Sequence, residues 1–482
     1  MKKLCLIIIF SLFVFSCSMA PSKKDLRRNI KTENNFRTET TFVNRKEISP
    51  FKWWEQFEDE QLNRIVEKAV SGNLDIMLAI KRVELLETQF SLSRRVRFPV
   101  LSGTAGVSYG RSPAMGMKSG TDTQVGQSSM EFGFSPETSG VYNLNTGLSF
   151  EVDIWGRLKS TEKAAIANLK ATKEDLQTVY LSVISQVVML YFDIAELQQL
   201  KKLNLSRLEF DELLHEISLK RYESGSGSAS EVEQTFGQME NSSANLADTK
   251  LKLTSKKYAL SVLLGENPDI NIVKTPKTSD LFFHNPEPVP AALPSSVFEN
   301  RADIKSAELK VEAARQEIGA AKADLFPRIS LTGMLGYLNV KELSQLFSSD
   351  YLTATVGADI NYTLAGGSKF SVVDQKVVLY EQAQLDYKKM VINAFKEIEE
   401  AMVAMENAEI QKESIQKRIK SMERILENSR FRYARGLMPY SQLIELEKNL
   451  ISLKQLQLSI EKGAVLSRVQ LHRALGGNWI EQ

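Results

Sequence analysis

Residues 144–157 read LNTGLSFEVDIWGR, and the hydrophobic period of the chain changes within this stretch. Up to Ile154, apolar side chains alternate with small or acidic ones, which is typical of a β-strand with two different faces. After Gly156 no proline occurs before Pro268, and the sequence is rich in Leu, Glu, Lys, Gln and Ala, which favour helix. The stretch therefore predicts a strand that leads directly into a helix. From Gly156 to Tyr222 that helix would be roughly 100 Å long.

The second half of the chain repeats this plan. Three pairs of motifs lie 211 positions apart: RYESG at 221–225 and RYARG at 432–436, Gly156 and Gly367, and Leu264-Gly265 and Leu475-Gly476. A fourth pair, Phe98-Pro99 and Phe326-Pro327, lies 228 positions apart, so the first half carries 17 additional residues there. We assign this surplus to a long loop within Arg111–Gly140, which is rich in Gly, Ser and Thr. Two tandem structural repeats are therefore predicted.

Each repeat contains further helical runs beside its long helix. They are Asp59–Phe98 and Ser230–Leu264 in repeat 1, and Asp303–Phe326 and Ser441–Leu475 in repeat 2. Two heptad series, Ile415/Met422/Ser429 and Ile419/Leu426/Tyr433, predict a coiled-coil seam. The predicted domains are a signal peptide 1–16, an extended lipid-anchored segment 17–58, repeat 1 at 59–265 with a β-hairpin at about 100–154, a linker 266–302, repeat 2 at 303–476 with a β-hairpin at about 328–364, and a tail 477–482.

Each repeat also contains two segments with a period of two. Leu144–Ile154 and Ala354–Leu364 alternate clearly, whereas Leu101–Tyr109 and Ile329–Tyr337 alternate more weakly. About ten residues is the length of a tilted transmembrane strand, and the polar opposite faces indicate a wet lumen. Solvated hairpins on a soluble domain are the alternative. Four strands cannot close a barrel around a polar lumen, and lipid does not tolerate open sheet edges, so several copies must share one barrel. Three copies would supply twelve strands.

The N-terminus has the features of an export signal. Lys2 and Lys3 precede the apolar run Leu4–Phe15, which is too short to span a bilayer but has the length of a signal-peptide core. Val14-Phe15-Ser16-Cys17 resembles the lipobox of bacterial lipoproteins, in which the cysteine becomes the lipidated first residue. Cys17 is therefore the predicted lipidation site. The alternative is an ordinary signal peptide followed by an incidental cysteine.

Composition argues against several other classes of function. Lys and Arg number 61 against 59 Asp and Glu, so no basic excess indicates a nucleic-acid partner. The three histidines, His215, His284 and His472, are far apart in sequence, so no metal site is predicted. No Walker or H-E-x-x-H motif occurs. We therefore predict no catalytic residue, no cofactor and no enzymatic activity.

Several motifs together resemble the TolC family of outer-membrane channel proteins, in its OprM/NodT-like lipoprotein branch. The resemblance covers essentially the whole mature chain, and it depends on the order and spacing of motifs that are individually weak. These motifs are Phe51–Asp59 with its tryptophan pair, Asp153-Ile154-Trp155-Gly156-Arg157, Leu293-Pro294-Ser295 followed by Arg301-Ala302-Asp303-Ile304, and Leu325–Thr332.

The resemblance implies a fold and a set of partners. The fold is mixed α and β: a long α-helical coiled-coil barrel that forms a periplasmic tunnel, and a transmembrane β-barrel with four strands per protomer. A homotrimer would contact outer-membrane lipid, a periplasmic adaptor protein and an inner-membrane pump of the RND type. The implied function is a passive exit duct for drugs or other small molecules. The alternatives are an outer-membrane duct for type I protein secretion and a periplasmic adaptor, although an adaptor would have only one helical hairpin.

The resemblance also assigns site residues. An acidic residue nine positions after the second turn glycine lies at the closed constriction in the family, which here selects Glu445, with Gln442 one turn earlier. The alternative is that Glu445 is an ordinary solvated helix residue. Six residues at the two Arg-Tyr-x-x-Gly turns are candidates for adaptor or tip contacts: Arg221, Tyr222, Gly225, Arg432, Tyr433 and Gly436. Helix packing, with a positive charge at a helix C-terminus, is the other interpretation of these residues.

Overall fold

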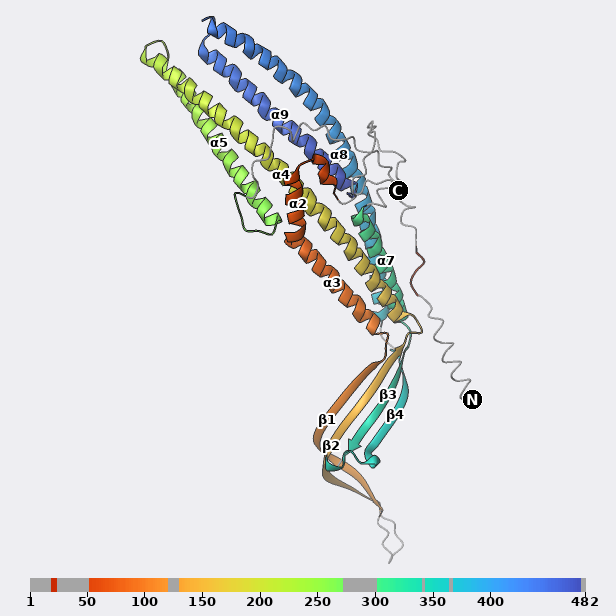
Figure 1. Ribbon diagram of the computed structural model, residues 1–482. Helices are drawn as coiled ribbons and strands as arrows, with labels where there is room; N and C mark the ends of the chain where they lie inside the picture. Colours follow the sequence, from red (N-terminus) through yellow and green to blue (C-terminus); the bar gives the residue numbers. More distant parts are fainter. Residues whose placement is uncertain are drawn as a thin grey trace, which may run out of the picture. The chain divides into compact units, whose positions relative to one another are not determined.

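The computed structural model describes residues 19–23, 52–119, 130–271, 301–339, 343–363 and 367–477. The chain divides into two compact units. The first unit includes Leu86–Leu169 and Lys310–Ala383. The second unit includes Lys170–Leu309 and Gln384–Gln482. The helices in Figure 1 are α2 (Glu60–Gly72), α3 (Leu74–Arg95), α4 (Arg157–Glu223), α5 (Ala229–Leu263), α7 (Ala302–Ala323), α8 (Ser368–Ala434) and α9 (Tyr440–Ala474). Three short 3-10 helices are η2 (Trp53–Phe57), η3 (Leu343–Gln345) and η4 (Ser349–Tyr351).

The strands of the first unit form one antiparallel sheet with the order β1-β2-β3-β4. They are β1 (Val100–Ser119), β2 (Met130–Val152), β3 (Arg328–Asn339) and β4 (Leu352–Asn361). The register of the four strands brings their mainly apolar positions together on one face of the sheet. One row across this face is Leu101, Leu148, Gly333 and Val356. The adjacent row on the other face is Ser102, Gly147, Met334 and Thr355. The prediction of four strands with one apolar face is therefore confirmed.

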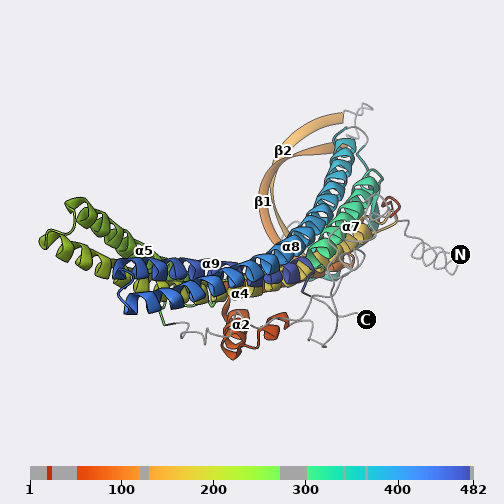
Figure 2. The ribbon, with the colours of Figure 1, turned by 90° about the horizontal axis from the view of Figure 1, so that it is seen from above.

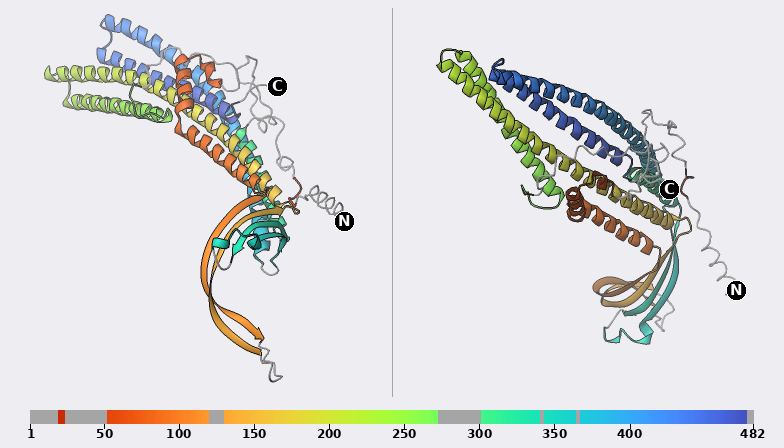
Figure 3. Two further views of the ribbon diagram at one scale, coloured as in Figure 1. Left: turned by 60° about the horizontal axis from the view of Figure 1, so that its bottom comes forward. Right: turned by 45° about the horizontal axis from the view of Figure 1, so that its top comes forward.

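The first hairpin is longer than the sequence predicted. β1 has 20 residues and β2 has 23, instead of about ten each, and Figure 3 shows this hairpin extending beyond β3 and β4. The prediction of a loop throughout Arg111–Gly140 is wrong, because the ladder continues from Gly110 opposite Ser139 to Ser119 opposite Met130. Ladder hydrogen bonds come from the backbone, so Gly, Ser and Thr, which are typical of loops, form them as well as other residues do.

The strand-to-helix junction at residues 151–157 is stabilised by hydrogen bonds of its own side chains. The Asp153 carboxylate accepts hydrogen bonds from the backbone N–H groups of Leu158 (3.0 Å) and Lys159 (2.8 Å), which caps the start of α4. Gly156 has φ 74°, a left-handed conformation that favours glycine. The Trp155 indole donates to the carbonyl of Pro327 at 2.9 Å, which ties the junction to the entry of β3. The predicted direct change from strand to helix is confirmed.

Two long helical hairpins dominate the second unit. α4 and α8 each have 67 residues, and α5 and α9, which fold back beside them, each have 35. Figures 1 and 2 show α4, α8 and α9 running side by side. The predicted heptad seam is confirmed in part. Ile415, Ile419, Leu426 and Ser429 are buried and Met422 is half-buried, whereas Tyr433, at the end of α8, is exposed.

A dense core in the second unit includes the tryptophan pair near the N-terminus. Trp53 and Trp54 are buried in η2 and belong to one cluster with Tyr191 and Phe192 of α4. Asp59 caps α2 through Gln61 N (2.8 Å) and accepts a hydrogen bond from the Tyr191 hydroxyl (2.5 Å). Burial, and then the Asp59 carboxylate, raises the pKa of Tyr191. Residues 53–57 were predicted to be extended, and this part of the prediction is wrong because the two indoles are drawn into the core.

The predicted helical run Asp59–Phe98 is broken in the middle. α2 ends at Gly72 and α3 begins at Leu74, with Asn73 between them in an extended conformation. The Asn73 side chain caps α3 by accepting from Asp75 N (2.9 Å), and it donates to the carbonyl of Leu263 at 2.8 Å. A single helix would lose both the cap and this long-range contact, so the prediction of one run is wrong.

Candidate functional site

The two hairpin turns have the same backbone. Gly225 has φ 73° and Gly436 has φ 72°, so both positions require the left-handed conformation that glycine adopts easily. In the first turn the N–H of Ser226 donates to the carbonyl of Arg221 at 2.8 Å. In the second, the N–H of Leu437 donates to Arg432 at 2.9 Å. This is the Schellman pattern, which satisfies the last carbonyls of a helix. The predicted reversals at both Arg-Tyr-x-x-Gly motifs are confirmed.

All six candidate contact residues lie exposed at these turns. Tyr222 is 50% exposed and Tyr433 is 42% exposed, and Arg221 and Arg432 are exposed beside them. The Tyr433 ring lies against the ring of Tyr440, with centroids 4.9 Å apart. These side chains are therefore not part of the hydrophobic core, and they are accessible to a partner.

Glu445 and Gln442 lie one turn apart on the exposed side of α9. The Glu445 carboxylate is half exposed and accepts a hydrogen bond from the Lys448 ammonium at 3.0 Å. The two predicted constriction residues thus lie together on one face of α9. Glu445 is held by Lys448, a residue that the sequence analysis did not identify.

Lys448 forms a buried ion pair between the two hairpins. Its Nζ lies 2.7 Å from Oδ1 of Asp211 on α4, and the side chains of the two residues are only 6% and 2% exposed. The other Asp211 oxygen accepts from the Ser242 hydroxyl of α5 at 2.5 Å. The sequence contains one signal for this pair: Lys448 lies at helical spacing between the buried Ile444 and Ile451, where a charge is unexpected. Its partner depends on the tertiary register of α4 against α9.

Further polar contacts join α4 to α9 in antiparallel register along the same interface. They are Lys462 with Glu196 (2.7 Å) and Asp193 (3.4 Å), Gln455 with Asn204 (2.7 Å), and Ser452 with Arg207 (3.0 Å). Burial lowers the pKa of Lys462, but the two carboxylates outweigh this effect and the net shift is upward. We call these contacts and the Asp211–Lys448 pair the polar ladder. Beside Lys448, Asp211 and Glu445 lies a polar cavity of about 230 Å³.

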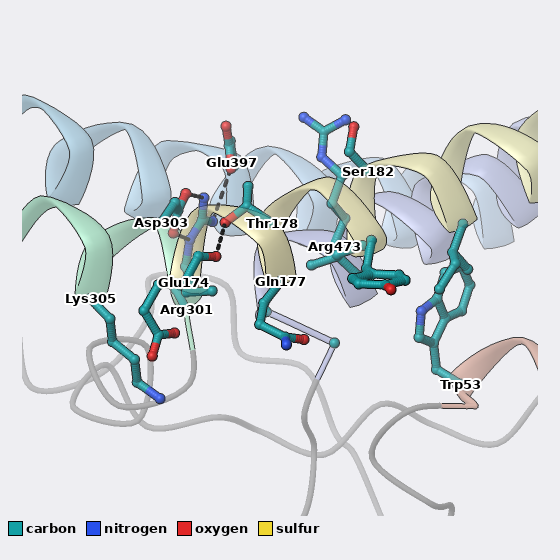
Figure 4. A pocket seen from close by; sticks show the side chains of 16 residues that line it. Trp53, Glu174, Gln177, Thr178, Ser182, Arg301, Asp303, Lys305, Glu397 and Arg473 are labelled. Carbon is teal, nitrogen blue, oxygen red and sulfur yellow. Dashed lines mark hydrogen bonds and ion pairs between the residues drawn. The ribbon is translucent and has the colours of Figure 1, made fainter. Parts of the chain in front are cut away.

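A second pocket, of about 340 Å³, lies between Trp53 and the start of α7 (Figure 4). At its wall Arg301 donates to both oxygens of Asp303 (3.0 and 2.6 Å), to Glu397 (2.9 Å) and to the carbonyl of Ala474 (2.7 Å). Since its guanidinium is occupied by these partners, Arg301 joins α7 to α8 and to the end of α9. The Arg-Ala-Asp-Ile motif at 301–304 therefore has a structural role, which is to connect these three helices.

Comparison with known proteins gives a consistent result. The sequence matches the Outer membrane efflux protein family over residues 65–266 and 293–477. It is 28% identical over 435 residues to the probable outer membrane lipoprotein SilC of Salmonella typhimurium, covering 89% of this chain and 88% of that protein. It is also 28% identical over 427 residues to the solvent efflux pump outer membrane protein SrpC of Pseudomonas putida, covering 88% and 87%.

Two solved structures share the fold. The outer-membrane channel OprN superposes with a TM-score of 0.79 at 23% identity, covering 96% of this chain and 100% of that one. The Campylobacter jejuni CmeC outer membrane channel also gives 0.79 at 23% identity, covering 97% and 96%.

A four-stranded sheet with one apolar face, combined with long helical hairpins, is the fold that this chain shares with the solved outer-membrane channels OprN and CmeC. This chain belongs to the Outer membrane efflux protein family. It is an outer-membrane efflux channel component and not an enzyme, as the sequence resemblance predicted.

Proposed function

We propose that three copies of this chain assemble into one passive exit duct, which docks to a periplasmic adaptor and an inner-membrane pump of the RND type. The observation that carries the assembly is the sheet. Within the described residues, β1 and β4 each pair on one side only, and the apolar face leaves Val356 92% exposed. Unpaired strand edges are not stable in lipid, so neighbouring copies must pair with them.

Native mass spectrometry of the detergent-solubilised protein tests this assembly. We expect one species with about three times the mass of a mature chain, because β4 of one copy would pair with β1 of the next. A stable, membrane-inserted monomer would contradict the proposal.

We also propose that Cys17 carries the lipid anchor. It lies outside the described residues, and the proposal depends on the lipobox-like sequence before it. The intact mass of the denatured chain reports on this directly. Cys17→Ala should lose the added mass of the acyl groups, and equal acyl content in both proteins would exclude Cys17 as the site.

The proposed cargo is small molecules. The name of SrpC, which is 28% identical to this chain, states solvent efflux. A duct for secreted proteins is the alternative. A deletion strain should become sensitive to organic solvents or antibiotics. A strain that kept its resistance and lost a secreted protein would support the alternative.

We further propose that three Glu445 carboxylates, with Gln442 beside them, form the narrow point of the duct. Glu445 supports this by its exposure and by its hydrogen bond to Lys448, which is itself fixed to the other hairpin. The position of the carboxylate is therefore tied to the contact between the hairpins. A ring of carboxylates would favour cations and exclude anions.

Single-channel recording of Glu445→Gln tests the constriction. We expect the cation preference to fall severalfold because three charges leave the narrow point. Glu413→Gln, which changes an exposed carboxylate paired with Lys417 on α8, is the matched control and should behave as the wild type. If both variants keep the wild-type selectivity, Glu445 does not line the constriction.

A further inference from the structure

The two hairpin tips have the same backbone turn but different surface chemistry. We define tip 1 as residues 219–231 and tip 2 as residues 430–442, which are equivalent at an offset of 211. Tip 1 contains two bases and two acids, Lys220, Arg221, Glu223 and Glu231, so its net charge is zero. Tip 2 contains three arginines, Arg430, Arg432 and Arg435, and no acid, so its net charge is +3.

The difference is clearest at the equivalent residues Arg221 and Arg432. The Arg221 guanidinium is used within its own tip, where it pairs with Glu231 at 2.6 Å and donates to the carbonyl of Ser226 at 3.3 Å. The position of Glu231 is occupied in tip 2 by Gln442, which carries no charge. Among the residues that the structure describes, Arg432 makes no ion pair. The charge that is neutralised in tip 1 is therefore presented to solvent in tip 2.

Arg435 adds a second available cation. Its guanidinium lies over the ring of Phe431, 3.9 Å from the centroid, and within the described parts of the chain it has no carboxylate partner. Arg430 differs, because it pairs with Glu447 at 2.5 Å. Tip 2 thus presents two uncompensated guanidinium groups, one of which is held in place by an aromatic ring.

Tip 2 also contains exposed apolar side chains beside these cations. Leu437 is 65% exposed and Phe431 is 55% exposed, and Tyr433 and Tyr440 pack against each other beside them. The equivalents of Phe431, Leu437 and Tyr440 in tip 1 are Lys220, Ser226 and Ala229. A favourable interaction with the helix dipole accounts for arginines at the end of α8. It does not account for exposed aromatic and aliphatic side chains, whereas Arg and Tyr around an apolar centre are the usual composition of a binding hot spot.

We propose that tip 2 is the dominant docking surface for the periplasmic adaptor, and that it binds an acidic segment bearing aliphatic side chains. Carboxylates of the adaptor pair with Arg432 and Arg435, and an aliphatic side chain packs on Leu437 and Phe431. Tip 1, whose net charge is zero and whose Arg221 is already paired, contributes less. This inference rests on the proposed docking to an adaptor, and it specifies which of the two tips makes the main contact with the adaptor.

The test compares matched charge reversals in the full-length, detergent-solubilised channel. The probe is the adaptor identified by crosslinking to the wild-type channel in cells, which is then purified and measured for affinity at low and moderate salt. We expect Arg432→Glu/Arg435→Glu to weaken binding by about 10- to 100-fold and to abolish its salt dependence. Arg221→Glu should weaken binding less than about threefold, because the Arg221 guanidinium is already paired with Glu231.

Two further variants separate charge from apolar contact. Leu437→Ser places the tip 1 residue in tip 2 and should weaken binding without changing the salt dependence. Ser226→Leu, the reverse exchange, should not strengthen it. Equal losses from Arg221→Glu and from the double reversal, or no loss from either, would overturn the inference while adaptor docking stands. If no adaptor crosslinks to or binds the wild-type channel, the proposed docking itself fails.

Discussion

We expect replacement of Lys448 by methionine to weaken the contact between the two hairpins by up to about 3–5 kcal/mol. The substitution removes the close counter-charge of the buried Asp211 carboxylate and leaves only Arg207, whose Nε lies 4.0 Å from it. The same substitution removes the hydrogen bond that holds Glu445. Both changes act at the proposed constriction. The variant should therefore leak ions in planar bilayers and unfold at a lower temperature than the wild type.

Two companion variants make this expectation specific. Asp211→Leu/Lys448→Met removes both charges together and should recover most of the lost stability, because buried pairs can often be replaced by apolar residues. Lys417→Met removes a lysine from an exposed ion pair on α8 and should change the stability by less than about 1 kcal/mol. If Lys448→Met is as stable and as closed as Lys417→Met, the buried pair does not hold the hairpins together.

We expect the second large effect on acidification, at His472. This imidazole is buried, stacks on Trp53 with centroids 5.0 Å apart, and lies 2.6 Å from the Gln56 amide nitrogen. Burial, and then the positive charge of Arg468, lowers the pKa of His472 from 6.5 to about 3. The folded state therefore keeps the imidazole neutral, while the unfolded chain takes up a proton below pH 6.5. Stability is present above pH 6.5 and falls as the pH drops towards 3.

The expected loss between pH 6.5 and pH 4 is about 3 kcal/mol per chain, as a pKa shift of one unit corresponds to about 1.4 kcal/mol. The measurement is thermal unfolding of the solubilised protein over this pH range, for the wild type and for His472→Gln. The substitution lowers the stability at neutral pH because it disturbs the stacking on Trp53. It should nevertheless flatten the pH dependence. Equal slopes for the two proteins would show that His472 does not titrate on unfolding.

Features encoded by local sequence were predictable. The change of period at residues 144–157 gave the strand, the helix and the junction between them, because Asp153, Trp155 and Gly156 act on neighbours in sequence and on one nearby strand. The two turns were predictable for the same reason, since Gly225 and Gly436 end their helices through local hydrogen bonds.

Features that depend on distant partners were not predictable in this way. The extension of the first hairpin through residues 110–119 depends on pairing with residues 130–139, and the composition of these segments suggests a loop. The break at Asn73 depends on the carbonyl of Leu263, 190 positions away. Asp211 and Lys448 could each be recognised as unusual, but only the register of α4 against α9 brings them together.

The equal lengths of the paired helices limit how this protein can change. α4 and α8 match at 67 residues, and α5 and α9 match at 35. Deleting one heptad from α4 and α5 alone would withdraw tip 1 by about 10 Å relative to tip 2 and shift every contact of the polar ladder beyond the deletion. An insertion or deletion in the hairpins is therefore tolerated only when both repeats acquire it together. The length of the channel can therefore change in evolution only by equal insertions or deletions in both repeats. The amino acids at one tip, in contrast, can change without a matching change at the other tip.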